Sequence, residues 1–199
     1  MQAPRLIGLT GPIGSGKDTA ADYLEQHYGF VKLSFAIPVK RLTATLLGLN
    51  MDEIMTREVK AKRVLNGTKT VGQVMQGIGE GLRQSISPDL WVDTLFANWD
   101  PTDDDKWVIA DVRYPNEVTR IQQLGGVVIQ ITGDPKNIRA NQVDQRDPTH
   151  ASETALQGMQ FYHQINNDGS MENLYRSIDT LMINRFGFKQ PLLHRLFTE

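Results

Sequence analysis

The sequence predicts an α/β protein with a parallel sheet of five strands, and three observations support this class. Short apolar stretches, each long enough for one strand, recur along the 199 residues. Helical patterns separate them, and such an alternation is typical of a parallel sheet layered with helices. A glycine-rich turn directly follows the first stretch and leads into a helix, as in the first strand–turn–helix unit of these folds. The expected strands are residues 5–10, 30–35, 107–110, 127–132 and 162–166.

The glycine-rich turn matches the phosphate-binding pattern G-x-x-x-x-G-K-[ST], with Asp18 at the position of the Ser or Thr. Glycines let the backbone turn several N–H groups toward one anion, and the N-terminus of the next helix adds partial positive charge. Lys17 supplies a mobile charge for terminal phosphates. A turn that merely caps a surface helix is the alternative, but the position between the first strand and the first helix favours phosphate binding. The residues of this phosphate loop are Gly11, Pro12, Ile13, Gly14, Ser15, Gly16, Lys17, Asp18 and Thr19.

Length and composition limit the class of protein. A chain of 199 residues with a formal net charge of -2 is most simply one domain, without a broad basic surface for nucleic acid. The absence of cysteine excludes disulfides and thiolate metal sites and suits a reducing cytosol. No apolar run reaches the roughly 20 residues that span a bilayer, and residues 1–10 do not resemble a secretory signal. We therefore expect a cytoplasmic protein with neither nucleic acid nor a membrane as its partner.

Turn and cap signals predict the helices. Gly29 is a suitable end for the first helix, Pro38 is a suitable first-turn residue for the second, and Ser170 is a weak N-cap signal for the last. The expected helices are residues 17–28, 38–48, 71–84, 88–99 and 170–186.

Two segments do not fit a simple crossover between strands. Residues 49–98 are too long for one, and they combine a charged stretch at 57–63 with two expected helices, so we expect an insert. Residues 134–149 are rich in Asp, Asn, Gln and Arg, and they resemble a mobile lid more than a core element.

The third expected strand ends at Asp111-Val112-Arg113. Ligands of open α/β sheets bind at the carboxyl ends of the strands, so Asp111 is expected beside the phosphate loop. There Asp111 would hold Mg²⁺ through water or orient a nucleophile, and Arg113 would clamp a phosphate. An Asp–Arg pair that only caps the following helix is the alternative, which the nearby loop makes less favourable.

A polar set in the insert is the next candidate. Its members share or neighbour one helical face at i, i+3, i+4 and i+7 spacing. Gly77 and one glycine of the set indicate either the close approach of a ligand or a helix break, because glycine costs about 1 kcal/mol inside a helix. The set consists of Gln76, Gly79, Glu80 and Arg83.

Three further residue types give weaker signals. Lys40 faces either a substrate anion or solvent, and taken alone it favours solvent. Trp91 is either a core residue or a platform for a base, and the core is favoured. The four histidines are scattered without metal-ligand spacing, so no zinc site is expected.

These motifs, in this order, resemble the phage-type deoxynucleoside monophosphate kinases of the P-loop nucleoside monophosphate kinase superfamily. The resemblance covers most of the chain, and the order and spacing of the motifs carry it. Asp18, which departs from the general loop pattern, is the usual residue in that family. The matching motifs are Gly16-Lys17-Asp18-Thr19, Ala36-x-Pro38-x-Lys40, Arg57-Glu58, Met75-Gln76-x-x-Gly79, Trp91-Val92, Asp111-Val112-Arg113 with Glu117, Thr149-His150-x-x-Glu153 and Asn167-Asp168-Gly169-Ser170.

The resemblance implies a three-layer α/β P-loop kinase with a parallel five-stranded sheet, a helical acceptor-binding insert at about 49–98 and a lid near 134–149. It implies phosphoryl transfer from ATP, with Mg²⁺, to a deoxynucleoside monophosphate. A monomer and a homodimer both remain open. A related kinase acting on dephospho-coenzyme A or phosphomevalonate is the first alternative. An NTP-hydrolysing switch is the second, although the base-recognition motif Asn-Lys-x-Asp of such a switch is missing.

The resemblance also implies roles for single residues. The phosphate loop would hold the ATP phosphates, Asn167 would border the adenine, and Arg139 or Arg146 would act from the lid. Asp111 would organise the reacting end and, with Asp18, bind the metal, unless Asp18 points away and caps its helix. The residues implied around the acceptor are Lys40, Arg57, Gln76, Gly79, Arg83, Trp91, Asp111, Arg113 and Glu117.

The chain departs from the family pattern near the Met75-Gln76 pair. Members often carry an arginine just before this pair and a threonine after the following glycine, whereas this chain has Gly72-Gln73 and Glu80 there. Binding of the acceptor phosphate is therefore expected to depend more on arginines elsewhere, namely Arg57, Arg83 and Arg113.

Overall fold

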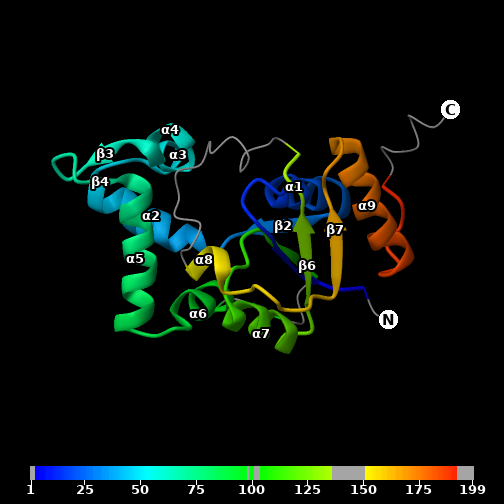
Figure 1. Ribbon diagram of the computed structural model, residues 1–199. Helices are drawn as coiled ribbons and strands as arrows, with labels where there is room; N and C mark the ends of the chain where they lie inside the picture. The colour runs from blue at the N-terminus through cyan, green and yellow to red at the C-terminus, as the bar shows by residue number, and fades with distance from the viewer. Residues whose placement is uncertain (1–2, 98, 101–103, 136–150, 192–199) are drawn as a thin grey trace. The chain divides into compact units, whose positions relative to one another are not determined.

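The computed structural model describes residues 3–97, 99–100, 104–135 and 151–191, and it describes only the backbone of Arg57, Ala151 and Glu153. The chain divides into two compact units. Unit 1 comprises Met1–Leu33 and Asp100–Glu199, and unit 2 comprises Ser34–Trp99 (Figure 1). The second unit therefore begins before the expected insert, at the end of the second strand.

Unit 1 contains one five-stranded sheet in which all strands run parallel, in the order β2-β5-β1-β6-β7. This arrangement confirms the α/β class and the parallel sheet that the sequence predicts. The second strand ends before the predicted residue 35, because the Ser34 hydroxyl accepts a hydrogen bond from the Ala36 N–H and starts the turn into the next helix. The strands are β1 (Leu6–Thr10), β2 (Phe30–Leu33), β5 (Lys106–Ile109), β6 (Val127–Thr132) and β7 (His163–Asn166).

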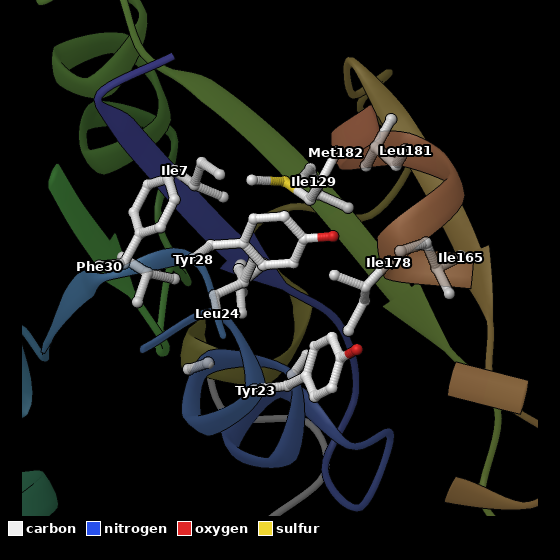
Figure 2. Packing of buried hydrophobic residues seen from close by; sticks show 14 of the residues in the cluster. Ile7, Tyr23, Leu24, Tyr28, Phe30, Ile129, Ile165, Ile178, Leu181 and Met182 are labelled. Atoms are coloured by element: carbon white, nitrogen blue, oxygen red, sulfur yellow. The ribbon is translucent and has the colours of Figure 1, made fainter. Parts of the chain in front are cut away.

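Helices cover both faces of this sheet. On one face lie α1 (Lys17–Tyr28) and α9 (Met171–Asn184), which contact each other, and α7 (Pro115–Gln123) packs against β1 and β6 on the other face (Figure 1). Successive side chains along β1 point to opposite faces of the sheet, so this strand contacts helices on both faces. Ile7 belongs to the core under α1 and α9 (Figure 2), whereas Gly8 faces α7, where an added Cβ would lie 2.7 Å from Ile121 Cδ1.

One aspartate joins α1 to α9. The Tyr28 hydroxyl donates to Asp179 Oδ1 at 2.7 Å, and the Tyr23 hydroxyl lies 3.0 Å from both carboxylate oxygens. Tyr23 also stacks on Tyr175, with 4.2 Å between the ring centroids. Burial, followed by the hydrogen bonds to Asp179, raises the pKa of both hydroxyls above the ordinary tyrosine value, so they remain protonated donors.

Unit 2 is helical, apart from a two-stranded hairpin. Its core centres on Ala44, Ile54 and Val71. Thr70 caps the longest helix, since its hydroxyl accepts from the Gln73 N–H, and this cap explains the predicted start at residue 71. The elements are α2 (Ala36–Leu47), α3 (Met51–Met55), α4 (Arg57–Ala61), β3 (Arg63–Val64), β4 (Lys69–Thr70), α5 (Val71–Ser85) and α6 (Leu90–Phe96).

Several boundaries differ from the prediction. The helix expected at 88–99 is shorter and forms α6, and the charged stretch at 57–63 forms α4 and the first residue of the hairpin. Most of the expected lid falls at residues 136–150, outside the described residues, and it is followed by α8 (Ala151–Thr154). Within the described part of the chain, no helix is long and apolar enough to cross a membrane.

Candidate active site

The phosphate loop connects β1 to α1, and its shape requires glycine. Gly11, Gly14 and Gly16 have φ values of 140°, 76° and 97°, in the region that side chains with a Cβ rarely adopt. A Cβ at Gly11 would in addition overlap the carbonyl oxygen of Ile131 in β6. Gly16 is the N-cap of α1 and has no side chain that could accept from the first N–H groups of the helix, a feature that suits an anion at this N-terminus.

Two buried polar groups in the loop suit a phosphate. Lys17 is only 8% exposed, and its Nζ donates to the carbonyls of Gly11 at 2.7 Å and Pro12 at 2.8 Å. Ser15 is fully buried, and its Oγ finds no hydrogen-bond partner among the described residues. A buried hydroxyl without a partner costs free energy, which a bound phosphate oxygen would recover.

Asp18 lies on the outer side of α1. Its carboxylate pairs with Lys32 of β2 at 3.1 Å, and the same ammonium lies 2.8 Å from Asp22. Partial burial alone would lower the pKa of Lys32, but the hydrogen bonds and charges of Asp22 and Asp18 raise it overall. Lys32 is not among the residues predicted from the sequence, although a lysine between apolar Val31 and Leu33 is a signal for it.

Asp111 lies at the carboxyl edge of the sheet, where the strand order places the loop as well. The residues on either side of it are tied to neighbouring strands: the Ala110 N–H donates to Leu33 O, and the Val112 N–H donates to Leu9 O. Asp111 is half-buried between these two anchors. No group of three or more His, Cys, Asp or Glu side chains is placed to hold a metal ion in the ranges that the structure covers.

Arg113 and Glu117 form the next part of this edge. Glu117, in the first turn of α7, is 1% exposed, and its Oε2 accepts from the backbone N–H groups of Arg113 at 2.7 Å and Tyr114 at 3.1 Å. The Arg113 guanidinium donates to the carbonyl of Ser152 in α8 at 3.3 Å. Glu117 therefore fixes the backbone from which the Arg113 side chain extends.

Asn167, directly after β7, also reaches the loop. It is 4% exposed, and its Nδ2 donates to the Ser15 carbonyl at 2.9 Å. The family resemblance implies a place beside the adenine for this residue, whereas its described side-chain contact is with the backbone of the loop.

The other candidates with described side chains lie in unit 2. Gln76, Gly79 and Arg83 are half-buried on α5, and Lys40 is half-buried on α2. Trp91 is buried in α6, and its Nε1 donates to the Gly79 carbonyl at 3.0 Å, so it joins α6 to α5.

Three predicted arginines cannot be placed by their side chains. Arg57 begins α4, but its side chain lies outside the described part of the structure, and Arg139 and Arg146 fall wholly outside it. Their proposed contacts stay predictions.

The similarity of this chain to known proteins indicates a kinase. The sequence matches the deoxynucleotide monophosphate kinase family over residues 49–178. A protein of Acanthamoeba polyphaga mimivirus named "Putative deoxynucleotide monophosphate kinase" is 33% identical over 198 residues, which cover 90% of this chain and 96% of that protein. An uncharacterised protein of Ictalurid herpesvirus 1, ORF76, is 28% identical over 72% of this chain and 54% of its own length.

A solved structure supports the fold. Shikimate kinase from Acinetobacter baumannii, in complex with shikimate, superposes with a TM-score of 0.50 at 16% identity, over 92% of this chain and 94% of that one. At this identity the likeness concerns the fold alone. The family match covers more than half of the sequence, and the chain belongs to the deoxynucleotide monophosphate kinase family.

Proposed function

We propose that the phosphate loop binds the phosphates of ATP and that the terminal phosphoryl group is transferred to a deoxynucleoside 5′-monophosphate. The diphosphate product would serve DNA precursor synthesis. The observation that carries the assignment of the loop is the buried Lys17 ammonium, held at the loop carbonyls beside the glycine-capped N-terminus of α1. Phosphoryl transfer needs positioning and charge neutralisation more than covalent help, and this loop offers both.

Lys17 would neutralise the charge that develops on the transferred group. A lysine carries a compact charge on a flexible stem, so the amine that now donates to the Gly11 and Pro12 carbonyls can turn to phosphate oxygens. The backbone N–H groups of the loop and the Ser15 hydroxyl would hold the oxygens that do not react.

Mg²⁺, when bound, would supply further neutralisation between the phosphates. Such an ion takes most of its ligands from phosphate and water, so one or two carboxylates suffice. Asp111, at the carboxyl edge of the sheet, is the candidate that we favour for this role. Asp18 already forms an ion pair with Lys32, so a metal role for it would compete with that pair.

Arg113 would bind the phosphate of the acceptor. A guanidinium grips a phosphate by two parallel hydrogen bonds, and Glu117 holds the Arg113 backbone in place for this task. For Gln76, Gly79 and Arg83 of α5 and for Lys40, contact with the acceptor stays a prediction from the family resemblance. A cytoplasmic location, a monomeric or homodimeric state and the lack of a nucleic-acid partner stay predictions from the sequence.

The test is a panel of phosphate acceptors. Purified protein with Mg²⁺ and ATP is given each deoxynucleoside monophosphate, each ribonucleoside monophosphate, dephospho-coenzyme A, phosphomevalonate or no acceptor. ADP is measured continuously, and the second product is identified by chromatography. We expect ADP formation to require a deoxynucleoside monophosphate and to yield the matching diphosphate.

Two outcomes would contradict the proposal. ADP release at the same rate without an acceptor would indicate an NTP-hydrolysing switch. Preferred transfer to dephospho-coenzyme A or phosphomevalonate would indicate one of the related kinases. A Lys17→Ala protein purified in parallel excludes a contaminating kinase, because it should be nearly inactive.

A further inference from the structure

We infer that Asn167 is a positioning residue that holds the phosphate loop in its binding shape, and that it acts on the phosphates of the nucleotide rather than on the adenine. The inference rests on the proposed function, in which this loop binds the phosphates of ATP.

Asn167 is anchored at both its backbone and its side chain. Its N–H donates to the Thr132 carbonyl at 3.0 Å, which extends the pairing of β6 and β7 by one bond. Its Nδ2 donates to the Ser15 carbonyl at 2.9 Å. A residue fixed to the end of β6 thereby fixes a peptide group of the phosphate loop.

Two glycines leave room for this contact. A Cβ at Gly16 would overlap Asn167 Nδ2, and a Cβ at Gly133 would overlap the Asn167 carbonyl. Both glycines have a φ of +97°, so their conformations also disfavour other residues. The backbone on each side of Asn167 therefore approaches it as closely as glycine allows.

The contact sets the direction of an N–H group in the loop. Ser15 O and the Gly16 N–H belong to one peptide unit, which is planar and trans, so they point in opposite directions. When Asn167 binds the carbonyl on one side, the N–H is directed to the other side. Without Asn167, this peptide could rotate, and the loop would lose a donor of fixed direction for a phosphate.

The burial of Asn167 argues against a role at the base. The residue is 4% exposed, which leaves little surface for a flat adenine ring, and its amide already donates to the Ser15 carbonyl. Inorganic tripolyphosphate has the phosphates of ATP and no base. Loss of a base contact would therefore weaken the binding of ATP alone, whereas loss of the loop contact would weaken the binding of both ligands.

The experiment measures binding by calorimetry for ATP and for inorganic tripolyphosphate, each with Mg²⁺. Asn167→Ala removes the amide, and Asn167→Leu keeps nearly the same branched shape but removes the donor to the Ser15 carbonyl without adding a charge. We expect each variant to bind both ligands about tenfold more weakly, with the same factor for the two ligands, as for the loss of one buried hydrogen bond. In kinetics, the KM for ATP should rise while the KM for the monophosphate acceptor stays unchanged.

Asn166→Ala is the matched control, since it removes the same side chain from the preceding, exposed residue. It should leave both affinities unchanged. Thermal unfolding identifies any variant that does not fold, and Asn167→Leu, which fills nearly the same volume without a charge, then replaces Asn167→Ala as the test.

Weaker ATP binding with unchanged tripolyphosphate binding would overturn the inference in favour of an adenine contact. Unchanged binding of both ligands would also overturn it, while leaving the proposed function intact. If the wild-type protein binds neither ligand, the proposed function itself fails, whatever the variants do.

Discussion

Two alanine substitutions in α5 can separate contact with the acceptor from ordinary helix packing. Apart from the backbone of its own helix, an added Cβ at Gly77 would meet no atom of the described residues within 4 Å, and at Gly79 it would lie 3.9 Å from the Val39 methyl groups, an ordinary contact. Neither position needs glycine for its backbone, because both lie inside a helix without a positive φ. The two positions thus lie in the same helix and both have room for a methyl group, but contact with the acceptor is predicted only for Gly79.

Each alanine should stabilise the protein. Replacing a glycine inside a helix by alanine gains about 0.5–1 kcal/mol. In a chain of this size, that gain corresponds to a rise in Tm of roughly 2–4 °C for each kcal/mol. If the acceptor nucleotide approaches Gly79 closely, the new methyl group there should also raise the KM for the monophosphate at least about tenfold, the equivalent of 1.4 kcal/mol.

The assay combines thermal unfolding with steady-state kinetics at saturating ATP and varied monophosphate. We expect Gly77→Ala to be more stable with unchanged kinetics, and Gly79→Ala to be more stable with a raised acceptor KM. Gly79→Ala kinetics equal to those of Gly77→Ala would refute the acceptor contact at Gly79. A Tm lowered by Gly79→Ala alone would instead assign this glycine to packing against α2.

Three further substitutions test the rest of the site and the core. Lys17→Ala should reduce turnover at least about 100-fold in a folded protein, as for the loss of one electrostatic group at the transition state; near-normal turnover would disprove the loop assignment. Arg113→Lys should weaken use of the acceptor in kinetics but not direct ATP binding, because lysine cannot form two parallel bonds; the reverse pattern would assign Arg113 to ATP. Asp179→Ala should lower the free energy of unfolding in urea by about 3 kcal/mol, because Tyr23 and Tyr28 lose their acceptor, and an unchanged value would contradict that role.

The fold could be predicted because its signals are local. Strands buried on both faces appear as short apolar runs, and β6 has the predicted bounds of 127–132. Gly29 ends α1 in the left-handed conformation, and the Ser170 hydroxyl accepts from the Asn173 N–H at the start of α9. Each of these cap signals lies within a few adjacent residues, so it can be recognised in a single sequence.

The short elements of unit 2 could not be predicted in the same way. Helices α3 and α4 have five residues each, too few for a clear hydrophobic period, and the strands of the hairpin have two each. The capping box at the start of α3 was present as a signal, because Asn50 and Glu53 stand three residues apart. Charged residues say little about backbone conformation, so the stretch at 57–63 did not indicate a helix or a strand.

The contacts of the candidate site were hidden for a different reason. Lys32 was one polar residue in a strand, and nothing near it in the sequence indicates a pair with Asp18. The hydrogen bond from Asn167 to Ser15 spans 152 positions of the chain. Such contacts follow from the order of the strands in the sheet, and this order cannot be derived from a single sequence.

The shape of the phosphate loop therefore depends on strands that are far from it in the sequence. Its pattern of glycines and lysine is contained in nine residues, but nothing in these residues alone forces the left-handed backbone of Gly11 and Gly16. The neighbours that fit against these two glycines are Ile131 of β6 and Asn167 after β7, which come late in the chain. A segment of β1, the loop and α1 alone would consequently contain the sequence motif without the contacts of Ile131 and Asn167 that shape the loop in the folded protein.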